Sequence, residues 1–326
     1  MSRMLTPLLV LVVAVLAVAL FLRGGQVLYA ISSWNTSQTT VSLGNSLPVV
    51  EFVNCSDDGS GYTDPMVQLL GGTTKIVTCN ATVTDPNGGS EINISTPKGV
   101  FFDNATKGIS TCNYLIGAAN IDCYRNNSCT WLGRINESSQ YVECKFSVWY
   151  NAKNTTSASD IWFGHINITD IMGGVGGNND SIEMEGLLAI GVSGVLSFGT
   201  KVAGVNDSTV GTGCGGCNDD IYNYGNVPFK IQTNGSDMSG TSCSIPRSNL
   251  HVNLTDNGLY SQSYALTAVT SDSVSALGAF RVWPNLTASV SDPTSPPSNT
   301  TYWGLGVPVG QSGTCQSTVW FLAISV

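Results

Sequence analysis

The sequence predicts an all-β protein with two tandem domains that follow an N-terminal hydrophobic helix. Apolar and polar residues alternate over short runs, as in TKIVTCNATVTD (74–85) and YVECKFSVWY (141–150), which is typical of strands with one buried face. Turn-forming sequences such as Asp85-Pro86-Asn87-Gly88 separate these runs. No amphipathic helix of useful length follows residue 30, so strands should build both domains.

The hydrophobic helix is predicted at the N-terminus, where residues 4–22 are apolar except for Thr6 and Pro7. This run is longer than the core of a typical signal peptide and approaches the ~20 residues needed to span a bilayer. We assign residues 1–30 to a signal peptide or signal-anchor helix and favour the uncleaved anchor, with cleavage after Ala30 as the alternative. Residues 31–46 are polar and rich in Ser and Thr, and we expect a stalk there.

The first domain is expected over residues 47–172, with strands at 47–53, 74–85, 141–150 and 161–170. Successive side chains of a strand point to opposite faces, which assigns the buried positions. The residues expected to point inward are Cys79, Ala81, Val83, Val142, Cys144, Phe146, Val148, Trp162, Ile166 and Ile168.

The second domain is expected over residues 182–326, after a flexible Gly/Asn linker at 173–181. It opens with the alternating run LLAIGVSGVLSFGTKV (187–202). Further strands are predicted within 225–235, 248–258, 277–290 and 315–326.

Two sets of segments carry a resemblance to known modules. TKIVTCNATVTDPNGG followed by HINITDIMGG resembles the Ig-like or PKD-like modules of archaeal cell-surface proteins. LLAIGVSGVLSFGTKVAGVNDST, YNYGNVPFKIQTNGSDM and TYWGLGVPVGQSGTC are similar to a second module of uncharacterised archaeal exoproteins. The resemblance covers most of residues 74–326 and implies two tandem Ig-like β-sandwich domains. It implies little about function, because such sandwiches serve many roles.

Composition limits the partners. Only 11% of residues are charged, the net charge is −9, and the 13 Lys and Arg residues are not clustered. We therefore expect no nucleic-acid partner, because the chain offers no basic patch for phosphates.

Cysteines and glycosylation sequons indicate an extracytoplasmic chain. The chain has 10 Cys residues, six before the predicted linker and four after it. Because Cys79 and Cys144 should both point inward, we expect them to bond to each other across the core, and the other pairings stay open. The candidate disulfide residues are Cys55, Cys79, Cys112, Cys123, Cys129, Cys144, Cys214, Cys217, Cys243 and Cys315.

Sequons of the form Asn-x-Ser/Thr are more frequent than chance, which would give about six. The candidate acceptors are Asn35, Asn54, Asn80, Asn93, Asn104, Asn126, Asn136, Asn154, Asn167, Asn179, Asn206, Asn234, Asn253, Asn285 and Asn299. Alternation should place Asn80, Asn167 and Asn253 on outward faces, and we expect lower occupancy at Asn54 because Cys55 follows it.

Catalytic motifs are missing from the sequence, and we predict no enzyme, no cofactor and no metal site. His165 and His251 should lie on outward strand faces, solvated rather than catalytic. The Cys214-Gly-Gly-Cys217 motif lacks the second C-x-x-C of a zinc site and the helix of a redox site, so disulfides are the better interpretation.

Acidic residues near turns lack the spacing of a Ca²⁺ loop and are predicted to be solvated. They are Asp57, Asp58, Asp64, Asp219 and Asp220.

These observations predict a membrane-anchored, glycosylated structural or adhesion protein of the cell envelope. Its partners would be the membrane, through the N-terminal helix, and envelope proteins, identical subunits or surface glycans. One alternative is a subunit of an extracellular pilus-like filament. A second is a carbohydrate-binding module, in which Trp131, Trp149, Trp283 and Trp303 would line a sugar platform.

Overall fold

The structure is a computed structural model, which describes residues 40–57, 66–112, 120–207, 209–211, 217–256, 258–266, 281–282, 286–288 and 292–326. Asn45–Val326 form one compact unit, separate from Met1–Gly44. The all-β prediction is confirmed in the described part, where helical structure is limited to two 3₁₀ turns, η1 (Arg247–Asn249) and η2 (Tyr260–Gln262). No helix in these ranges is long and apolar enough to cross a membrane. The predicted helix at 1–30 and most of the predicted stalk lie outside the described residues.

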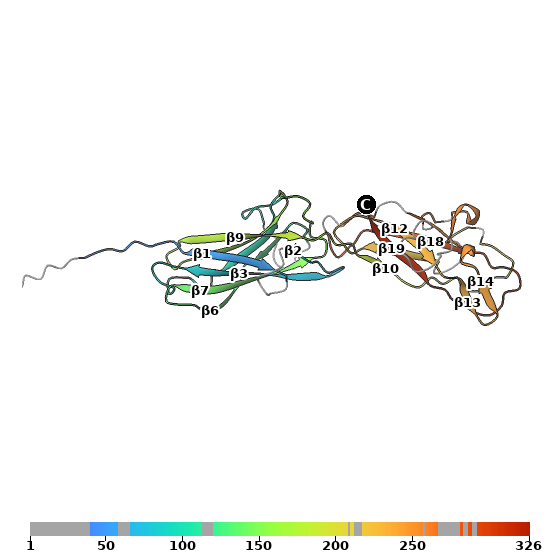
Figure 1. Ribbon diagram of the computed structural model, residues 1–326, viewed down its shortest axis with the longest axis horizontal. Coiled ribbons are helices and arrows are strands. Elements are labelled where there is room, and N and C mark those ends of the chain that lie inside the picture. The colour runs from blue at the N-terminus through green and yellow to red at the C-terminus, as the bar shows by residue number, and fades with distance from the viewer. Residues whose placement is uncertain are drawn as a thin grey trace, which may run out of the picture. The chain divides into compact units, whose positions relative to one another are not determined.

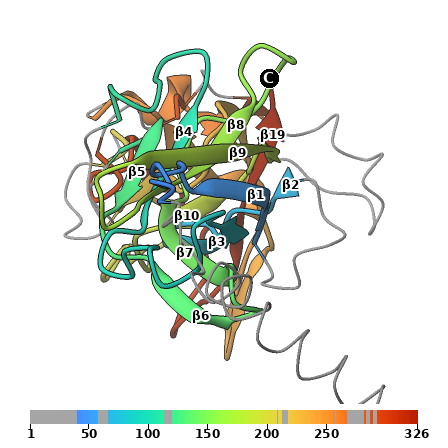
Figure 2. The ribbon, with the colours of Figure 1, turned by 90° about the vertical axis from the view of Figure 1, so that its left-hand side faces the viewer.

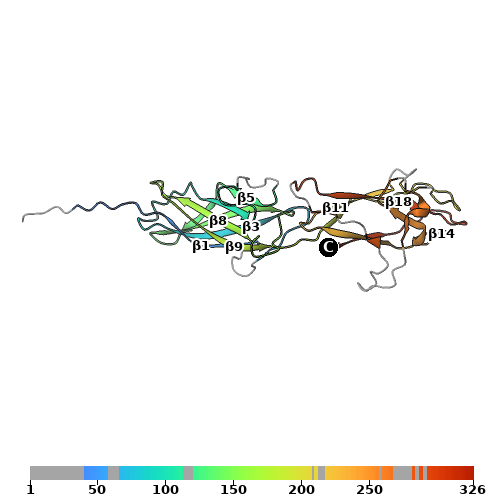
Figure 3. The same cartoon turned by 90° about the horizontal axis from the view of Figure 1, so that it is seen from above.

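The strands fall into two groups along the chain (Figure 1 and Figure 3). The first group, called the N-terminal sheet pair, forms a four-stranded sheet in the order β1-β3-β7-β6 and a five-stranded sheet in the order β2-β9-β8-β4-β5. Its strands are β1 (Val49–Ser56), β2 (Met66–Val67), β3 (Thr74–Thr84), β4 (Lys98–Asp103), β5 (Cys123–Asn126), β6 (Thr130–Arg134), β7 (Ser139–Trp149), β8 (Trp162–Thr169) and β9 (Val175–Met184).

One apolar core lies between the two sheets of this pair, which face each other in the end-on view (Figure 2). The four-stranded sheet contributes Val77 and Phe146, and the five-stranded sheet contributes Phe101 and Trp162. Phe101 stacks on both Phe146 and Trp162, with ring centroids 5.6 and 5.0 Å apart. The inward positions predicted for the strands at 74–85, 141–150 and 161–170 are confirmed, because all of them are buried.

Two disulfides lie inside this core, but the predicted Cys79–Cys144 bond is wrong. Cys79 and Cys144 are opposite each other on neighbouring strands, β3 and β7, rather than on facing sheets. Cys79 bonds to Cys55 on β1, and Cys144 bonds to Cys129, which precedes β6. Strand alternation correctly shows that a cysteine points inward, but it does not reveal which inward neighbour it meets.

A glycine of the opposite sheet lies against each of these disulfides. A Cβ atom on Gly164 of β8 would come within 3 Å of both sulfur atoms of the Cys55–Cys79 bond. A Cβ atom on Gly99 of β4 would lie 3.0 Å from the sulfur of Cys144 and 2.7 Å from the ring of Phe146. The sheets can approach this closely only because these two positions carry no side chain.

The prediction of a flexible linker at 173–181 is wrong, because most of this segment forms strand β9, which pairs with β8. Its glycines mark close approach rather than flexibility: a Cβ on Gly176 would meet the carbonyl oxygen of Pro48, and one on Gly177 would lie 2.8 Å from the His165 ring. Side chains of β9 also bind β1, since Asn178 donates to the Val50 carbonyl at 3.1 Å and Asp180 accepts from the Cys55 amide at 2.9 Å.

The second group, called the C-terminal sheet group, contains sheets in the orders β10-β11-β18-β15-β16, β17-β12-β19 and β13-β14. A second apolar core, which includes Phe229, Ile231, Val252 and Trp303, lies within this group. Its strands are β10 (Ile190–Val192), β11 (Asn218–Asn223), β12 (Phe229–Gly235), β13 (Met238–Gly240), β14 (Cys243–Ile245), β15 (Leu250–Asn253), β16 (Tyr264–Ala265), β17 (Arg281–Val282), β18 (Ser298–Leu305) and β19 (Val319–Ser325).

The alternating run at 187–202 is a strand only over β10, which is a correction to the prediction of strand throughout. After Val192 the chain leaves β11 and continues without a strand partner in the described structure. Alternation alone therefore does not make a strand, because the backbone also needs a neighbour to pair with.

The two groups are joined at residues 185–189, which are held rather than free. The buried side chain of Asn226 donates to the carbonyls of Ala152 and Glu185, both at 2.8 Å, and accepts from the Leu187 amide at 2.6 Å. The ring of Tyr150 packs edge-on against Tyr224, with centroids 5.9 Å apart.

Candidate functional site

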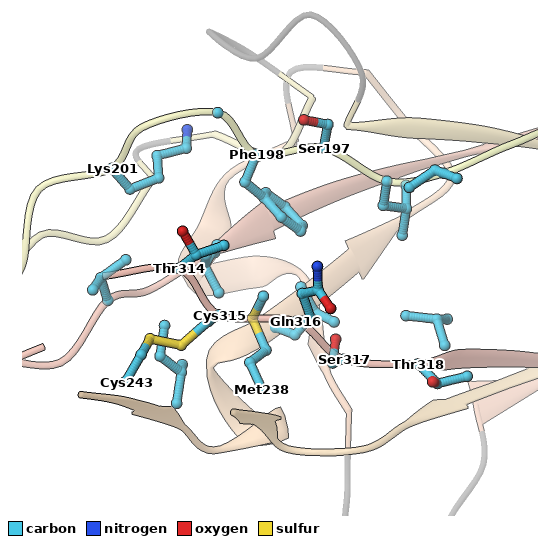
Figure 4. Close-up of a pocket in the computed structure, with 18 of the residues that line it drawn as sticks. Ser197, Phe198, Lys201, Met238, Cys243, Thr314, Cys315, Gln316, Ser317 and Thr318 are labelled. Atoms are coloured by element: carbon cyan, nitrogen blue, oxygen red, sulfur yellow. A yellow bond between two sulfur atoms is a disulfide. The ribbon is translucent and has the colours of Figure 1, made fainter. Parts of the chain in front are cut away.

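A cavity of about 1090 Å³ in the C-terminal sheet group is the candidate functional site, called the β19 cavity below. One wall is the strandless segment after β10, here called the 195–203 segment, and the opposite wall is residues 311–321, which include the start of β19. Met238 and the Cys243–Cys315 disulfide lie along the same side of the cavity as residues 314–318 (Figure 4).

Both walls carry unpaired backbone. In the described structure, the 195–203 segment makes no backbone–backbone hydrogen bond, although Ser193 before it and Gly204 after it each make one. β19 pairs with β12 along one edge, and among the described strands it has no partner along the other. Peptide groups on two sides of the cavity are therefore available to hydrogen-bond with an incoming chain.

The apolar core of the C-terminal sheet group is incompletely covered at this cavity. Leu196 and Phe198 from one wall and Val319 and Phe321 from the other all pack against the core, yet each is only half-buried. Figure 4 shows the ring of Phe198 directed toward the opposite wall. An occupant with apolar side chains would complete the burial of these four residues. Each Å² of apolar surface removed from water in this way would stabilise the bound state by about 25 cal/mol.

The charged side chains of the cavity lining already have partners. Its charged lining residues are Lys201 and Asp219. The Lys201 ammonium lies 2.8 Å from the Asp207 carboxylate, and Asp219 accepts hydrogen bonds from the hydroxyl and amide of Ser193. The remaining lining is neutral, so the geometry suits an uncharged extended peptide better than an ionic ligand.

No sequence motif marks this cavity. Its signal in the sequence was the alternating run at 187–202, which predicted strand structure where the fold supplies no partner. Of the residues singled out in the sequence, Cys243 and Cys315 fall at the cavity through their bond, and Asp219, which was predicted to be solvated, is buried in its lining.

The other cysteines are structural. Cys112 bonds to Cys123 under a small apolar cluster formed with Val100 and Phe102. Cys217 is also disulfide-bonded, and Cys214 lies outside the described residues. The described residues contain no free cysteine.

Most described sequon asparagines reach solvent. Asn104, Asn136, Asn179 and Asn206 are exposed, whereas Asn126 and Asn234 are buried. The amide nitrogen of Asn126 is also engaged, because it donates to the Lys145 carbonyl at 3.0 Å. The half-buried sequon asparagines are Asn54, Asn80, Asn93, Asn154, Asn167, Asn253 and Asn299, and Asn35 and Asn285 lie outside the described residues.

Neither histidine is the solvated side chain that the sequence predicted. His165 is only 8% exposed, because it packs over Gly177 of β9. His251 is half-buried and stacks on Tyr260, with ring centroids 3.9 Å apart. Burial lowers the pKa of both imidazoles below the ordinary value.

The tryptophans do not form one platform. Trp303 is fully buried in the C-terminal core and so is excluded from a sugar-binding surface. Trp131 and Trp149 pack against the core of the N-terminal sheet pair, and Trp283 lies outside the described residues.

The acidic residues are engaged individually. Asp57 lies 3.3 Å from the Lys75 ammonium, and Asp220 accepts from the Thr300 hydroxyl at 2.5 Å. Asp58 and Asp64 lie outside the described residues. Within the described ranges, no group of three or more His, Cys, Asp or Glu side chains is arranged to hold a metal ion.

Comparison with known proteins adds little. No protein-family model matches the chain, and no curated protein matches it. Among solved structures, a DUF4466 family protein from Parabacteroides merdae aligns with 80% of this chain and 99% of its own, at 10% identity and a TM-score of 0.22. That score is too low to support an argument about fold or function.

Proposed function

We propose that the chain is an extracytoplasmic structural protein of the cell envelope, anchored by its N-terminal apolar run and built from two tandem Ig-like β-sandwiches. The observation that carries this proposal is the pair of disulfides inside the core of the N-terminal sheet pair. Both bonds are buried and lie against glycines of the facing sheet, so the fold is built around oxidised cysteines. Disulfides of this kind form and persist in oxidising compartments.

Sequon exposure supports the same function. A chain in which only 11% of all residues are charged needs another source of surface hydration, and exposed sequons such as Asn104, Asn136, Asn179 and Asn206 supply sites for it. Glycans at these positions would also shield the sheets from unwanted edge pairing.

A pilus-like filament subunit is the second candidate, and the β19 cavity favours it. Two backbone edges that have no partner among the described residues, around a partly apolar groove, fit a peptide strand from another protein. The carbohydrate-binding alternative has less support, because Trp303 is buried.

Protease treatment of intact native cells tests the envelope function. The chain should be degraded while a cytosolic marker protein survives, and fractionation should recover the untreated chain with the membrane or envelope. A chain that resists the protease on intact cells and is recovered in the cytosolic fraction would rule the proposal out.

A further inference from the structure

We infer that the β19 cavity binds an extended segment from a second copy of this chain, namely residues 40–44, and that copies join head to tail in this way. This inference rests on the proposed envelope function and deepens it by naming the partner. It is carried by the acceptor walls, by the unprotected edge of β19, and by the character of residues 40–44.

Each acceptor wall has a backbone edge without a partner among the described residues. On one wall, Leu196 and Phe198 are half-buried while Val195 is 89% exposed, which is the alternation of a strand with one buried face. Its backbone nevertheless makes no backbone–backbone hydrogen bond to any described residue. A chain placed between the 195–203 segment and β19 would pair with both walls and close the gap between their sheets.

The free edge of β19 is unusual for a protein surface. Val319–Ser325 contains no charged residue and no proline, and Trp320 and Leu322 are exposed. Natural edge strands are normally protected by lysines, prolines or bulges, because a long apolar edge recruits other strands. An edge without such protection indicates that it is covered when the protein is assembled.

Residues 40–44 have the character of the missing strand. Val41 and Leu43 are 82% and 84% exposed and stand two residues apart, so in an extended chain they share one face. The chain carries no charged side chain from Gly24 to Val50. An uncharged segment with alternate apolar residues matches the partly apolar walls of the β19 cavity, whose two charged lining residues, Lys201 and Asp219, are already engaged by their neighbours.

The donor segment begins at a fixed point. The side-chain amide of Asn45 donates to the Asp170 carboxylate at 2.8 Å, and the backbone amide of Ser46 donates to the Asn87 side-chain oxygen at 2.6 Å. The compact unit is therefore anchored from Asn45 onward, and the exposed Val41 and Leu43 stand just before this anchor in the chain.

A second copy can supply this segment without rearrangement. Pro48 lies against Gly176 near the start of β9, whereas Glu185 at the far end of β9 precedes the C-terminal sheet group. Ten residues of strand extend about 33 Å, whereas the five residues 40–44 extend at most about 17 Å, so they are too short to reach from Asn45 past the far end of β9. A donor from another molecule has no such limit.

The donor, residues 40–44, and the acceptor, the β19 cavity, are different surfaces of the chain, so the contact between two copies is heterologous. Such a heterologous contact leaves a free donor at one end of each pair and a free acceptor at the other. Association should therefore continue beyond the dimer and give a distribution of sizes that grows with concentration.

Sedimentation velocity of the full chain in mild detergent tests the donor. The unaltered chain should form species of increasing size, and the double variant Val41→Asp/Leu43→Asp should need at least about tenfold higher concentration to do so, because it places carboxylates in an apolar groove. Ile94→Asp is the matched control, since Ile94 is also an exposed apolar residue but lies in the N-terminal sheet pair. Equal association of the double variant and the unaltered chain would overturn the inference.

Cross-linking between two differently tagged preparations tests the acceptor. One carries Leu43→Cys and the other carries Ser317→Cys, which lies on the cavity wall. A short bis-maleimide should join the two tags, and it should not join Leu43→Cys to the control Ser181→Cys, which is exposed on β9. Equal yields in the two mixtures would contradict the assigned acceptor.

The two proposals can fail separately. If the double variant assembles like the unaltered chain while intact cells still expose it to protease, strand donation is wrong and the envelope function stands. If the chain is cytosolic in native cells, the envelope function is wrong whatever the purified protein does.

Discussion

Replacement of Gly164 by alanine should destabilise the N-terminal sheet pair, because Gly164 lies directly against the Cys55–Cys79 disulfide. The new methyl group would come within 3 Å of both sulfur atoms. A disulfide between two strands cannot swing aside, so the facing sheets would have to move apart. Overpacking of this kind costs about 1–3 kcal/mol.

The disulfide itself provides the second arm of this experiment. Removal of the bond by Cys55→Ala/Cys79→Ala opens a loop with a sequence separation of 24, which should cost about 3 kcal/mol. Without the sulfur atoms, the closest remaining contact of the Gly164 methyl group is the Cβ of residue 55 at 3.6 Å, an ordinary distance. Without the disulfide, Gly164→Ala should lower the free energy of unfolding only slightly. The coupling energy between Gly164→Ala and the removal of the disulfide should therefore equal most of the cost of Gly164→Ala in the intact chain.

Guanidinium denaturation measures this coupling, with the unfolding midpoint of each protein converted to a free energy. The four proteins are the unaltered chain, Gly164→Ala, Cys55→Ala/Cys79→Ala and the combined variant. Gly194→Ala is the matched control, since nothing lies within 4 Å of its Cβ position and its midpoint should stay within error or rise slightly. An equal cost of Gly164→Ala with and without the disulfide would refute the packing argument.

The junction at residues 185–189 and the two histidines give two further predictions. Asn226→Ala should lower the free energy of unfolding by about 2–4 kcal/mol, because the carbonyls of Ala152 and Glu185 and the amide of Leu187 lose the Asn226 side chain as their partner. Limited proteolysis should then cut this variant within residues 185–189. A variant that stays uncut there, with an unchanged denaturation midpoint, would show that Asn226 does not hold the junction. Because burial lowers the pKa of His165 and His251, the unfolded chain binds more protons than the folded chain once the pH falls through 6.5, and stability should fall from there toward pH 5. Replacing both histidines by glutamine should flatten that pH dependence of the denaturation midpoint, and an unchanged slope would contradict it.

Strands with clean alternation could be predicted from the sequence. In β7 and β8, apolar residues occupy every second position, and the inward residues from Val142 to Ile168 are buried as expected. The same alternation could not identify the partner of Cys79, because Cys55 and Cys144 flank it on the two neighbouring strands and both point inward.

Strand β9 and the β19 cavity could not be predicted, for opposite reasons. The glycines of β9 look like a linker, but they allow Pro48 and His165 to approach the strand. The run after Val192 looks like a strand, but its backbone has no partner within the described fold. The local sequence indicates whether a segment is able to form a strand. Whether it does so depends on the tertiary structure, which must place a neighbouring strand beside it.

A combined disulfide and glycan map of the chain from its native source tests the central claim most directly. Non-reducing peptide mapping should recover the bonds Cys55–Cys79, Cys112–Cys123, Cys129–Cys144 and Cys243–Cys315. Intact glycopeptides should carry sugar at the exposed Asn104, Asn136, Asn179 and Asn206 and none at the buried Asn126 and Asn234. Free thiols at the core cysteines together with bare exposed sequons would contradict an extracytoplasmic, glycosylated envelope protein.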